Sequence, residues 1–216
     1  MEGNLKFYTK GEEIANAVTH GIGAGLSVAA LVLLIVFAEN RGDKWYVLSY
    51  TIYGVSLLLL YLGSTLYHSI ANVKAKKLFR IFDHASIYIL IAGTYTPFTL
   101  TVLRPTVGWI IFSIVWILAV AGIIMKVLFI GKFNVLSTII YIGMGWIIIF
   151  AMKYLMALLP VNGIILLFAG GIIYTAGAVL YLFDKVPYNH AVWHVFVMGG
   201  SLCHFFCILL YLLPNK

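Results

Sequence analysis

Residues 190–213, HAVWHVFVMGGSLCHFFCILLYLL, indicate the class of fold, because this stretch contains no lysine, arginine, aspartate or glutamate. A helix of about 20 apolar residues crosses the hydrocarbon core of a bilayer, which is roughly 30 Å thick. The stretch therefore predicts a transmembrane helix. His190 and His194 lie four residues apart at its start, and because ionisable side chains are costly within a membrane span, this pair is a candidate for function.

The composition extends this prediction to the whole chain. Of its 216 residues, 63% are hydrophobic and 10% are charged, whereas soluble domains average about 45–50% and about 25%. Seven stretches are apolar and long enough to span a bilayer, and they leave only short connections between them. We therefore expect an all-α membrane protein, a seven-transmembrane helix bundle formed as one domain by residues 1–216. The predicted spans are 17–38, 45–70, 81–103, 106–125, 133–152, 159–183 and 190–213.

Basic residues predict the orientation, because lysine and arginine in short loops are retained on the cytoplasmic side. The N-terminal side carries nine of them and the other side five. We therefore expect a multi-pass protein of the cell membrane with a cytoplasmic N-terminus and an external C-terminus. These anchors explain the net charge of +7 without a nucleic-acid partner. The nine are Lys6, Lys10, Lys74, Lys76, Lys77, Arg80, Lys126, Lys132 and Lys185, and the five are Arg41, Lys44, Arg104, Lys153 and Lys216.

Polar side chains gather toward one end of the predicted bundle. An ionisable group within a span costs roughly 2.5–3.5 kcal/mol on insertion scales, so their placement points to function. Only His204 lies deeper among the histidines, about 15 Å beyond His194 at 1.5 Å per residue. The group toward the cytoplasmic face consists of His20, His68, Asp83, His84, His190 and His194.

The spacing of three histidines predicts a metal site. His190 and His194 share one helix face and can bind one ion together. Ser64 and His68 share a face of the helix 45–70 by the same rule. If that helix packs against 190–213, then His68, His190 and His194 supply three nitrogens and leave a fourth position open, which is the pattern of catalytic zinc.

The base of a zinc hydrolase must come from another helix. In the helical motif HExxH a glutamate follows the first histidine, but here that position is Ala191. Asp83 is the only acidic residue within a predicted span, and no lysine or arginine lies within the predicted core to pair with it. We expect Asp83 to orient the attacking water and to accept its proton, and Ser64 to hydrogen-bond the water or a substrate oxygen.

Structural roles are the alternative for these residues. His190 and His194 could face lipid headgroups, and Ser64 could be one of the hydroxyl groups common in membrane helices. His84 points roughly 100° away from Asp83 on a helix, which favours a packing role. His20 could cap a helix or hydrogen-bond within the bundle, and we expect a buried hydrogen bond for His204.

Four stretches carry a resemblance to a known family. The chain resembles the hemolysin III family, the bacterial branch of the progestin and adipoQ receptor superfamily, nearly from end to end. The resemblance implies seven helices, a cytoplasmic N-terminus and a zinc ion held by His68, His190 and His194, with Asp83 and Ser64 nearby. Kinship with alkaline ceramidases implies hydrolysis of a lipid amide. The stretches are EEIANAVTHGIGA from Glu12, STLYHS from Ser64, FDHASIYILIAGTYTPF from Phe82 and HAVWHVFVMGGSLCHF from His190.

Three functions are compatible with this sequence. The first is a zinc-dependent hydrolase of lipid amides or esters, with membrane lipids as substrate. The second is a membrane-damaging pore former, which the family name suggests but which lacks an amphipathic stretch or a secretion signal here. The third is a sensor of membrane lipid composition that keeps zinc for structure. A retinal protein is excluded because 190–213 has no lysine, and paired histidines on one helix suit a small ion better than haem.

Overall fold

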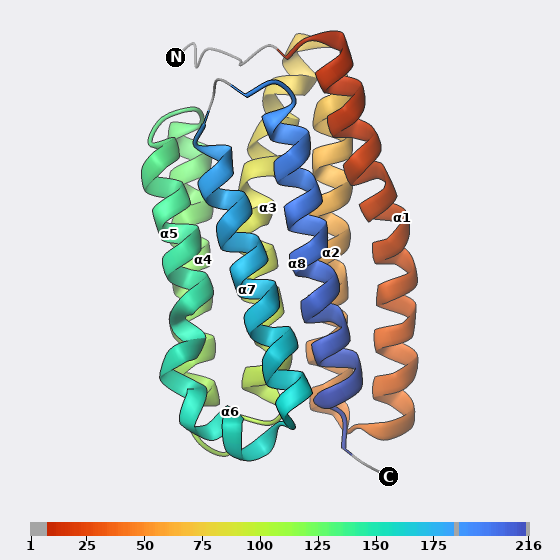
Figure 1. Ribbon diagram of the computed structural model, residues 1–216, viewed down its shortest axis with the longest axis vertical. Coiled ribbons are helices and arrows are strands. Elements are labelled where there is room, and N and C mark those ends of the chain that lie inside the picture. The colour runs from red at the N-terminus through yellow and green to blue at the C-terminus, as the bar shows by residue number, and fades with distance from the viewer. Residues whose placement is uncertain (1–7, 184–185, 215–216) are drawn as a thin grey trace.

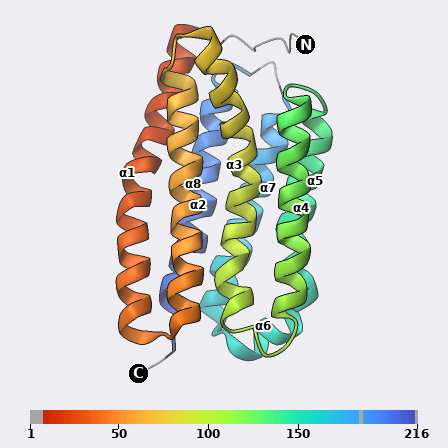
Figure 2. The same cartoon turned by 180° about the vertical axis from the view of Figure 1, so that it is seen from behind.

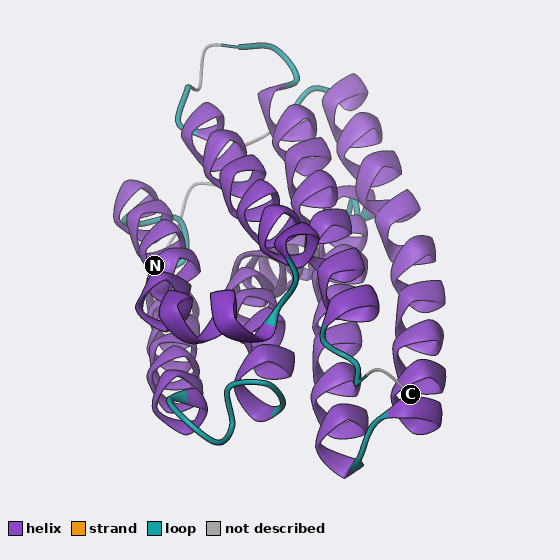
Figure 3. Cartoon of the chain, turned by 60° about the horizontal axis from the view of Figure 1, so that its bottom comes forward, coloured by secondary structure: helices purple, strands orange, loops and turns teal. Residues whose placement is uncertain are grey.

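The computed structural model describes residues 8–183 and 186–214, and in these ranges the chain is helical with short loops and no strand (Figure 3). Figure 1 shows the long helices side by side, with the first and last helices adjacent. The helices are α1 (Lys10–Arg41), α2 (Lys44–Ser69), α3 (Val73–Leu100), α4 (Gly108–Phe129), α5 (Asn134–Trp146), a 3₁₀ turn η1 (Ile147–Ala151), α6 (Met152–Leu158), α7 (Val161–Tyr181) and α8 (Asn189–Tyr211).

Each predicted span overlaps a helical segment, and the prediction of an all-α membrane protein is confirmed. Six segments of the described chain are long and apolar enough to cross a membrane: α1, α2, α4, the segment Asn134–Leu158, α7 and α8. The chain is thus a multi-pass membrane protein. The six do not include α3, so the seven-span count stays a prediction.

Helix α3 is less apolar than the six segments above, and this is tolerated because neighbouring helices cover it. More than half of its residues are buried, and it runs the length of the bundle between α2 and α4 (Figure 2). Its hydroxyl groups bond to their own backbone: Thr94 donates to the Leu90 carbonyl at 2.7 Å and Thr96 to the Ala92 carbonyl at 2.8 Å. A helix shielded in this way can carry polar side chains at low cost.

Several predicted span boundaries differ from the structure. Helix α1 begins at Lys10 instead of residue 17, because Thr9 and Glu12 form a capping box that satisfies the first backbone N–H groups. The fifth segment continues through η1 and α6 to Leu158, past the predicted end at 152. Lys153 therefore lies within a helix. Lys6, Lys185 and Lys216, which entered the prediction of orientation, lie outside the described residues.

Arg80 and Lys126 also lie within helices, although the sequence analysis placed both in connections. The side chain of Asn72 caps α3 by accepting from the backbone N–H groups of Lys74 and Ala75, so Arg80 lies two turns inside that helix. Lys126 lies in the last turn of α4. Both face the bundle interior, with exposed fractions of 8% for Arg80 and 2% for Lys126. The expectation that no lysine or arginine lies within the predicted core to pair with Asp83 overlooked Arg80, which is within electrostatic reach of that carboxyl group.

Tyrosine side chains bridge α2 and α8. Tyr50 donates to the Ile208 carbonyl at 2.8 Å, and Tyr61 donates to the Ser201 hydroxyl at 2.7 Å. Tyr50 and Tyr61 are buried, and a buried phenol normally requires such a partner. These bonds fix the end of α2 opposite the start of α8, where the histidines lie.

Candidate metal centre

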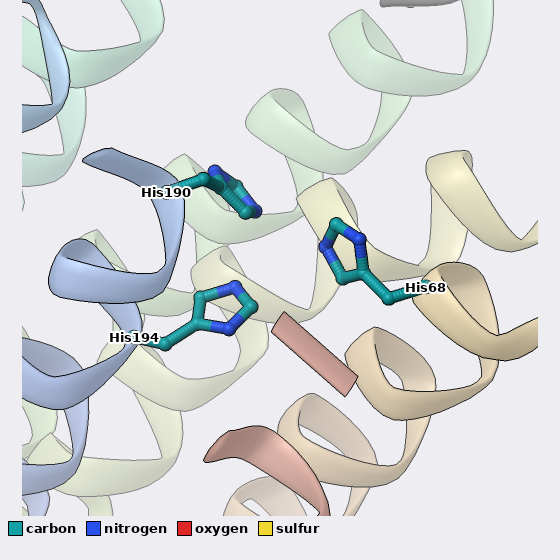
Figure 4. Close-up of side chains that lie close together, drawn as sticks. All are labelled: His68, His190 and His194. Atoms are coloured by element: carbon teal, nitrogen blue, oxygen red, sulfur yellow. The ribbon is translucent and has the colours of Figure 1, made fainter. Parts of the chain in front are cut away.

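Three histidines from two helices converge at one end of the bundle. His68 lies in the last turn of α2, and His190 and His194 lie in the first two turns of α8, with their rings directed toward one another (Figure 4). All three are buried, and one nitrogen of each lies within 4.8 Å of the others. The structure thus brings together the three residues that the spacing predicted.

The hydrogen bonds around these rings leave nitrogens directed at a common point. Nε2 of His68 is buried without a hydrogen-bond partner in the described part of the chain, which is costly unless something binds there. Nδ1 of His194 lies 3.2 Å from the Asn16 carbonyl oxygen, so its Nδ1–H can donate there and Nε2 keeps its lone pair. The residues present can therefore hold a metal ion.

Glu13 contacts the histidine cluster, although the sequence did not single it out as a candidate. Its Oε2 lies 2.7 Å from Nδ1 of His68, and its Oε1 lies 2.9 Å from Nζ of Lys76. A carboxylate that accepts the Nδ1–H of a histidine fixes the tautomer that binds metal through Nε2 and raises the basicity of that nitrogen. The predicted start of the first span at residue 17 left Asp83 as the only acid in a membrane helix. Glu13 lies within α1, so Asp83 is not the only one.

Other residues of α1 also contact the histidines. The Thr19 hydroxyl oxygen lies 3.1 Å from Nδ1 of His194, and Nδ2 of Asn16 lies 3.4 Å from Nδ1 of His68. Glu13, Asn16 and His20 recur at intervals of three and four residues, which is the spacing of one helix face. A polar stripe on an otherwise apolar helix is the sequence signal that could have identified them.

Asp83 and Ser64 lie at the same end of the bundle as the histidines. The Asp83 carboxyl group is buried and within electrostatic reach of His68 and Arg80. The Ser64 hydroxyl is fully buried beside that carboxyl group, but no hydrogen bond of regular geometry joins it to a described residue. An acid and an unpaired hydroxyl therefore lie near the three imidazoles, and both have capacity to bind a further group.

A cavity opens from the histidines into the middle of the bundle. Asp83, His190 and His194 line one end of it and His204 lines the other, with mostly aliphatic and aromatic side chains between them. His190 and His204 are separated by about 21 Å along α8, at 1.5 Å per residue. The cavity thus offers an apolar lining between polar side chains near its two ends.

The remaining histidines have separate surroundings. His20 stacks on His194, with ring centroids 3.4 Å apart and planes 12° apart, but neither of its nitrogens has a hydrogen-bond partner among the described residues. The expected hydrogen bond of His20 therefore stays a prediction. Nε2 of His204 lies 3.1 Å from the Leu167 carbonyl oxygen, which confirms a hydrogen bond there. His84 packs beside Lys126 and Tyr141 at a small pocket.

Comparison with known proteins gives relatives along nearly the whole chain. A family model described as haemolysin-III related matches residues 8–205. The chain is 55% identical to Hemolysin-3 of Bacillus cereus over 94% of its own length and 93% of that protein, and 54% identical to the Hemolysin-3 homolog of Bacillus subtilis (strain 168) over 94% and 96%. It is 30% identical to the human monocyte to macrophage differentiation factor over 93% and 84%. No solved structure matches.

Proposed function

Since this chain belongs to the haemolysin-III related family, we propose that it is a zinc-dependent membrane hydrolase of lipid amides or esters, similar in chemistry to ceramidases. One observation carries the proposal. Three buried histidines meet at the end of a long apolar cavity, with the carboxyl group of Asp83 at the same end. This combination suits a substrate with an apolar chain and one polar bond to be cleaved.

Zinc is the metal that the ligands favour. Three imidazoles with an open fourth position are typical of catalytic zinc, whereas magnesium and calcium prefer oxygen ligands. Zinc held by His68, His190 and His194 would lower the pKa of a bound water toward about 7 and polarise the scissile carbonyl. Glu13 supports this ligand set by holding the Nδ1–H of His68, so that its Nε2 remains basic.

Asp83 and Ser64 would carry out the proton and oxygen chemistry of the proposed reaction. The Asp83 carboxylate would accept the proton of the attacking water and deliver it to the leaving group. The Ser64 hydroxyl would donate to the substrate carbonyl oxygen. A buried acid in low dielectric exchanges a proton with substrate rather than with bulk water. In this proposal the apolar cavity holds the acyl chain and excludes water from it.

The direction of substrate entry follows from the proposed topology. We place residues 1–216 in the cell membrane as one domain of seven spans, with α3 as the seventh and the N-terminus cytoplasmic. The support is the excess of lysine and arginine at the end of the bundle that holds the histidines. Membrane lipids would then reach the site from the cytoplasmic leaflet.

Hydrolysis by the purified full chain tests this proposal. We would measure fatty-acid release from a ceramide and from a diacyl ester in detergent micelles. We expect His194→Ala and Asp83→Ala each to abolish release, and Cys203→Ala to retain it. Cys203 is a suitable control because it lies on α8 as a free, half-buried thiol. Unchanged turnover in either of the first two variants would contradict the proposed mechanism.

The names of two relatives, Hemolysin-3 and its homolog, favour a second candidate, membrane damage. Liposomes that hold the purified protein and a trapped dye would test it, and leakage that rises with protein content would support it. Intact liposomes would exclude this activity. One zinc ion per chain without turnover on either lipid would instead favour the lipid sensor.

A further inference from the structure

Lys126 is a buried cation that the proposed reaction does not use. It is 2% exposed in the last turn of α4, and it makes no hydrogen bond or ion pair with any residue that the structure describes. Lysines near helix ends usually extend to water and to lipid headgroups, but this side chain is turned into the bundle. A buried ammonium group without a partner is costly, so a ligand is the expected compensation.

The electrostatic neighbour of Lys126 is another cation. Arg80, 8% exposed on α3, is within electrostatic reach of Lys126. Both also act on His84. The Arg80 guanidinium group lies against Gly131 in the turn after α4, so the two cations lie at the end of the bundle that holds the metal centre. Asp83 is also within electrostatic reach of Arg80, so the positive charge available to an anion is that of Lys126.

A small pocket lies at Lys126 and adjoins the large cavity. His84, Ser137 and Thr138 line it together with Lys126, and its volume is about 30 Å³, which suits about two water-sized groups. His190 and Trp193 line both the pocket and the large cavity. A ligand can therefore place one or two oxygens at Lys126 while the rest of it occupies the large cavity.

We propose that Lys126 forms a binding subsite for a phosphate oxyanion, and that the occupant is the phosphate of an amphiphile whose acyl chain lies in the large cavity. Lysine binds phosphate as a point charge, and Ser137 and Thr138 line the same pocket with hydroxyl groups. The acyl chain in this assignment rests on the proposed lipid hydrolase, but the anion subsite does not. The subsite would select lipids that carry a phosphate over neutral lipids with the same chains.

Binding of matched lipids to the purified full chain tests this subsite. We would titrate didecanoyl phosphatidic acid and didecanoylglycerol, which differ only in the phosphate, and follow tryptophan fluorescence, to which Trp193 contributes between the two spaces. We expect at least about tenfold tighter binding of the phosphatidic acid, since a charge-assisted hydrogen bond is worth this much. Equal affinities in the wild-type protein would overturn the proposal without any variant.

Three variants assign the preference to Lys126. Lys126→Gln should reduce it to about threefold or less, and Lys126→Arg should restore it. Lys132→Gln, an exposed lysine at the same end, should leave it unchanged, which separates the subsite from surface attraction. If Lys126→Gln prefers phosphatidic acid over didecanoylglycerol as strongly as the wild-type protein does, the proposal is overturned.

Two further arms separate the alternatives. Inorganic phosphate that competes with phosphatidic acid in the wild-type protein and not in Lys126→Gln would support the subsite with free phosphate as its occupant. The same titrations in His194→Ala measure binding without hydrolysis. A protein that discriminates between the two lipids without hydrolysing either would contradict the proposed function and leave the anion subsite intact.

Discussion

Nδ1 of His68 and Oε2 of Glu13 lie 2.7 Å apart, so a carboxylate on α1 determines which nitrogen of a histidine on α2 remains available to a metal. The second oxygen of Glu13 lies 2.9 Å from Nζ of Lys76, which holds the carboxylate in place. The metal centre is therefore built from three helices, although its predicted ligands come from only two.

Replacing Glu13 should weaken metal binding without removing a ligand. We expect Glu13→Gln to reduce zinc affinity by about 10–100-fold, the usual loss when the carboxylate partner of a ligating histidine is removed. Competition with a coloured chelator would measure it. Glu12→Gln is the matched control, because glutamine also completes the capping box at Thr9. Equal affinity in Glu13→Gln and the wild-type protein would show that the contact with His68 does not tune the metal.

Loss of a ligand should remove the metal itself. We expect about one zinc per chain in the wild-type protein by elemental analysis, and much less than one in His68→Ala, because two histidines of one helix do not complete a three-nitrogen site. His204→Ala should keep its zinc, since that ring bonds to the Leu167 carbonyl. Zinc retained at wild-type level in His68→Ala would exclude the three-histidine centre.

Removal of the metal should also destabilise the protein. A ligand that binds only the folded state stabilises it by about 2.7 kcal/mol at a concentration 100 times its Kd. We therefore expect a strong zinc chelator to lower the unfolding temperature of the wild-type protein in detergent and added zinc to restore it. The His194→Ala protein should show no response to either treatment. If neither the chelator nor added zinc changes the unfolding temperature of the wild-type protein, the metal does not stabilise the fold.

The His20 side chain should lower the stability of the metal-free protein relative to an apolar side chain at this position. Both ring nitrogens are buried without partners in the described ranges, and each such group costs about 1–3 kcal/mol. We expect His20→Leu, a change of similar volume, to unfold at the same or a higher temperature than the wild-type protein, although it removes the stacking on His194. A clear loss of stability would mean that a bound water or ion satisfies the His20 ring.

Close packing of α3 and α4 depends on Gly122. A Cβ atom at this position would overlap the ring of Tyr88, which is fully buried. We expect Gly122→Ala to cost about 1–3 kcal/mol through overpacking. Gly143→Ala is the control, because a Cβ atom there meets nothing within 4 Å, and alanine favours helix by about 0.5–1 kcal/mol. Unfolding in detergent would measure both, and equal stabilities would disprove the close contact.

The sequence predicted the positions of the helices well, because apolar length is a direct physical requirement of the bilayer. It also brought His68 together with His190 and His194, because ionisable groups at one depth of a membrane protein tend to share a site. Asp83 and Ser64 lie at the same end of the bundle, and their catalytic roles stay predictions.

The contacts between distant parts of the chain could not be predicted in the same way. Hydropathy placed the start of the first helix at residue 17 and so left Glu13 outside the membrane helices. It also placed Arg80 and Lys126 in loops, because a positive charge in a sequence does not show whether its helix turns it toward lipid or toward a covered interior. The side on which a helix is buried depends on all of its neighbours.

The adjacency of α1 and α8 has a consequence for biosynthesis. Helix α1 supplies Glu13 and the Asn16 carbonyl, and α8 supplies two of the three histidines. A ribosome completes the first of these helices early and the other last. A polypeptide that ends before residue 189 has only one of the three imidazoles, so a metal ion held by all three could bind only after α8 has been made. Binding of an ion by the three histidines would thus report that synthesis and insertion are complete.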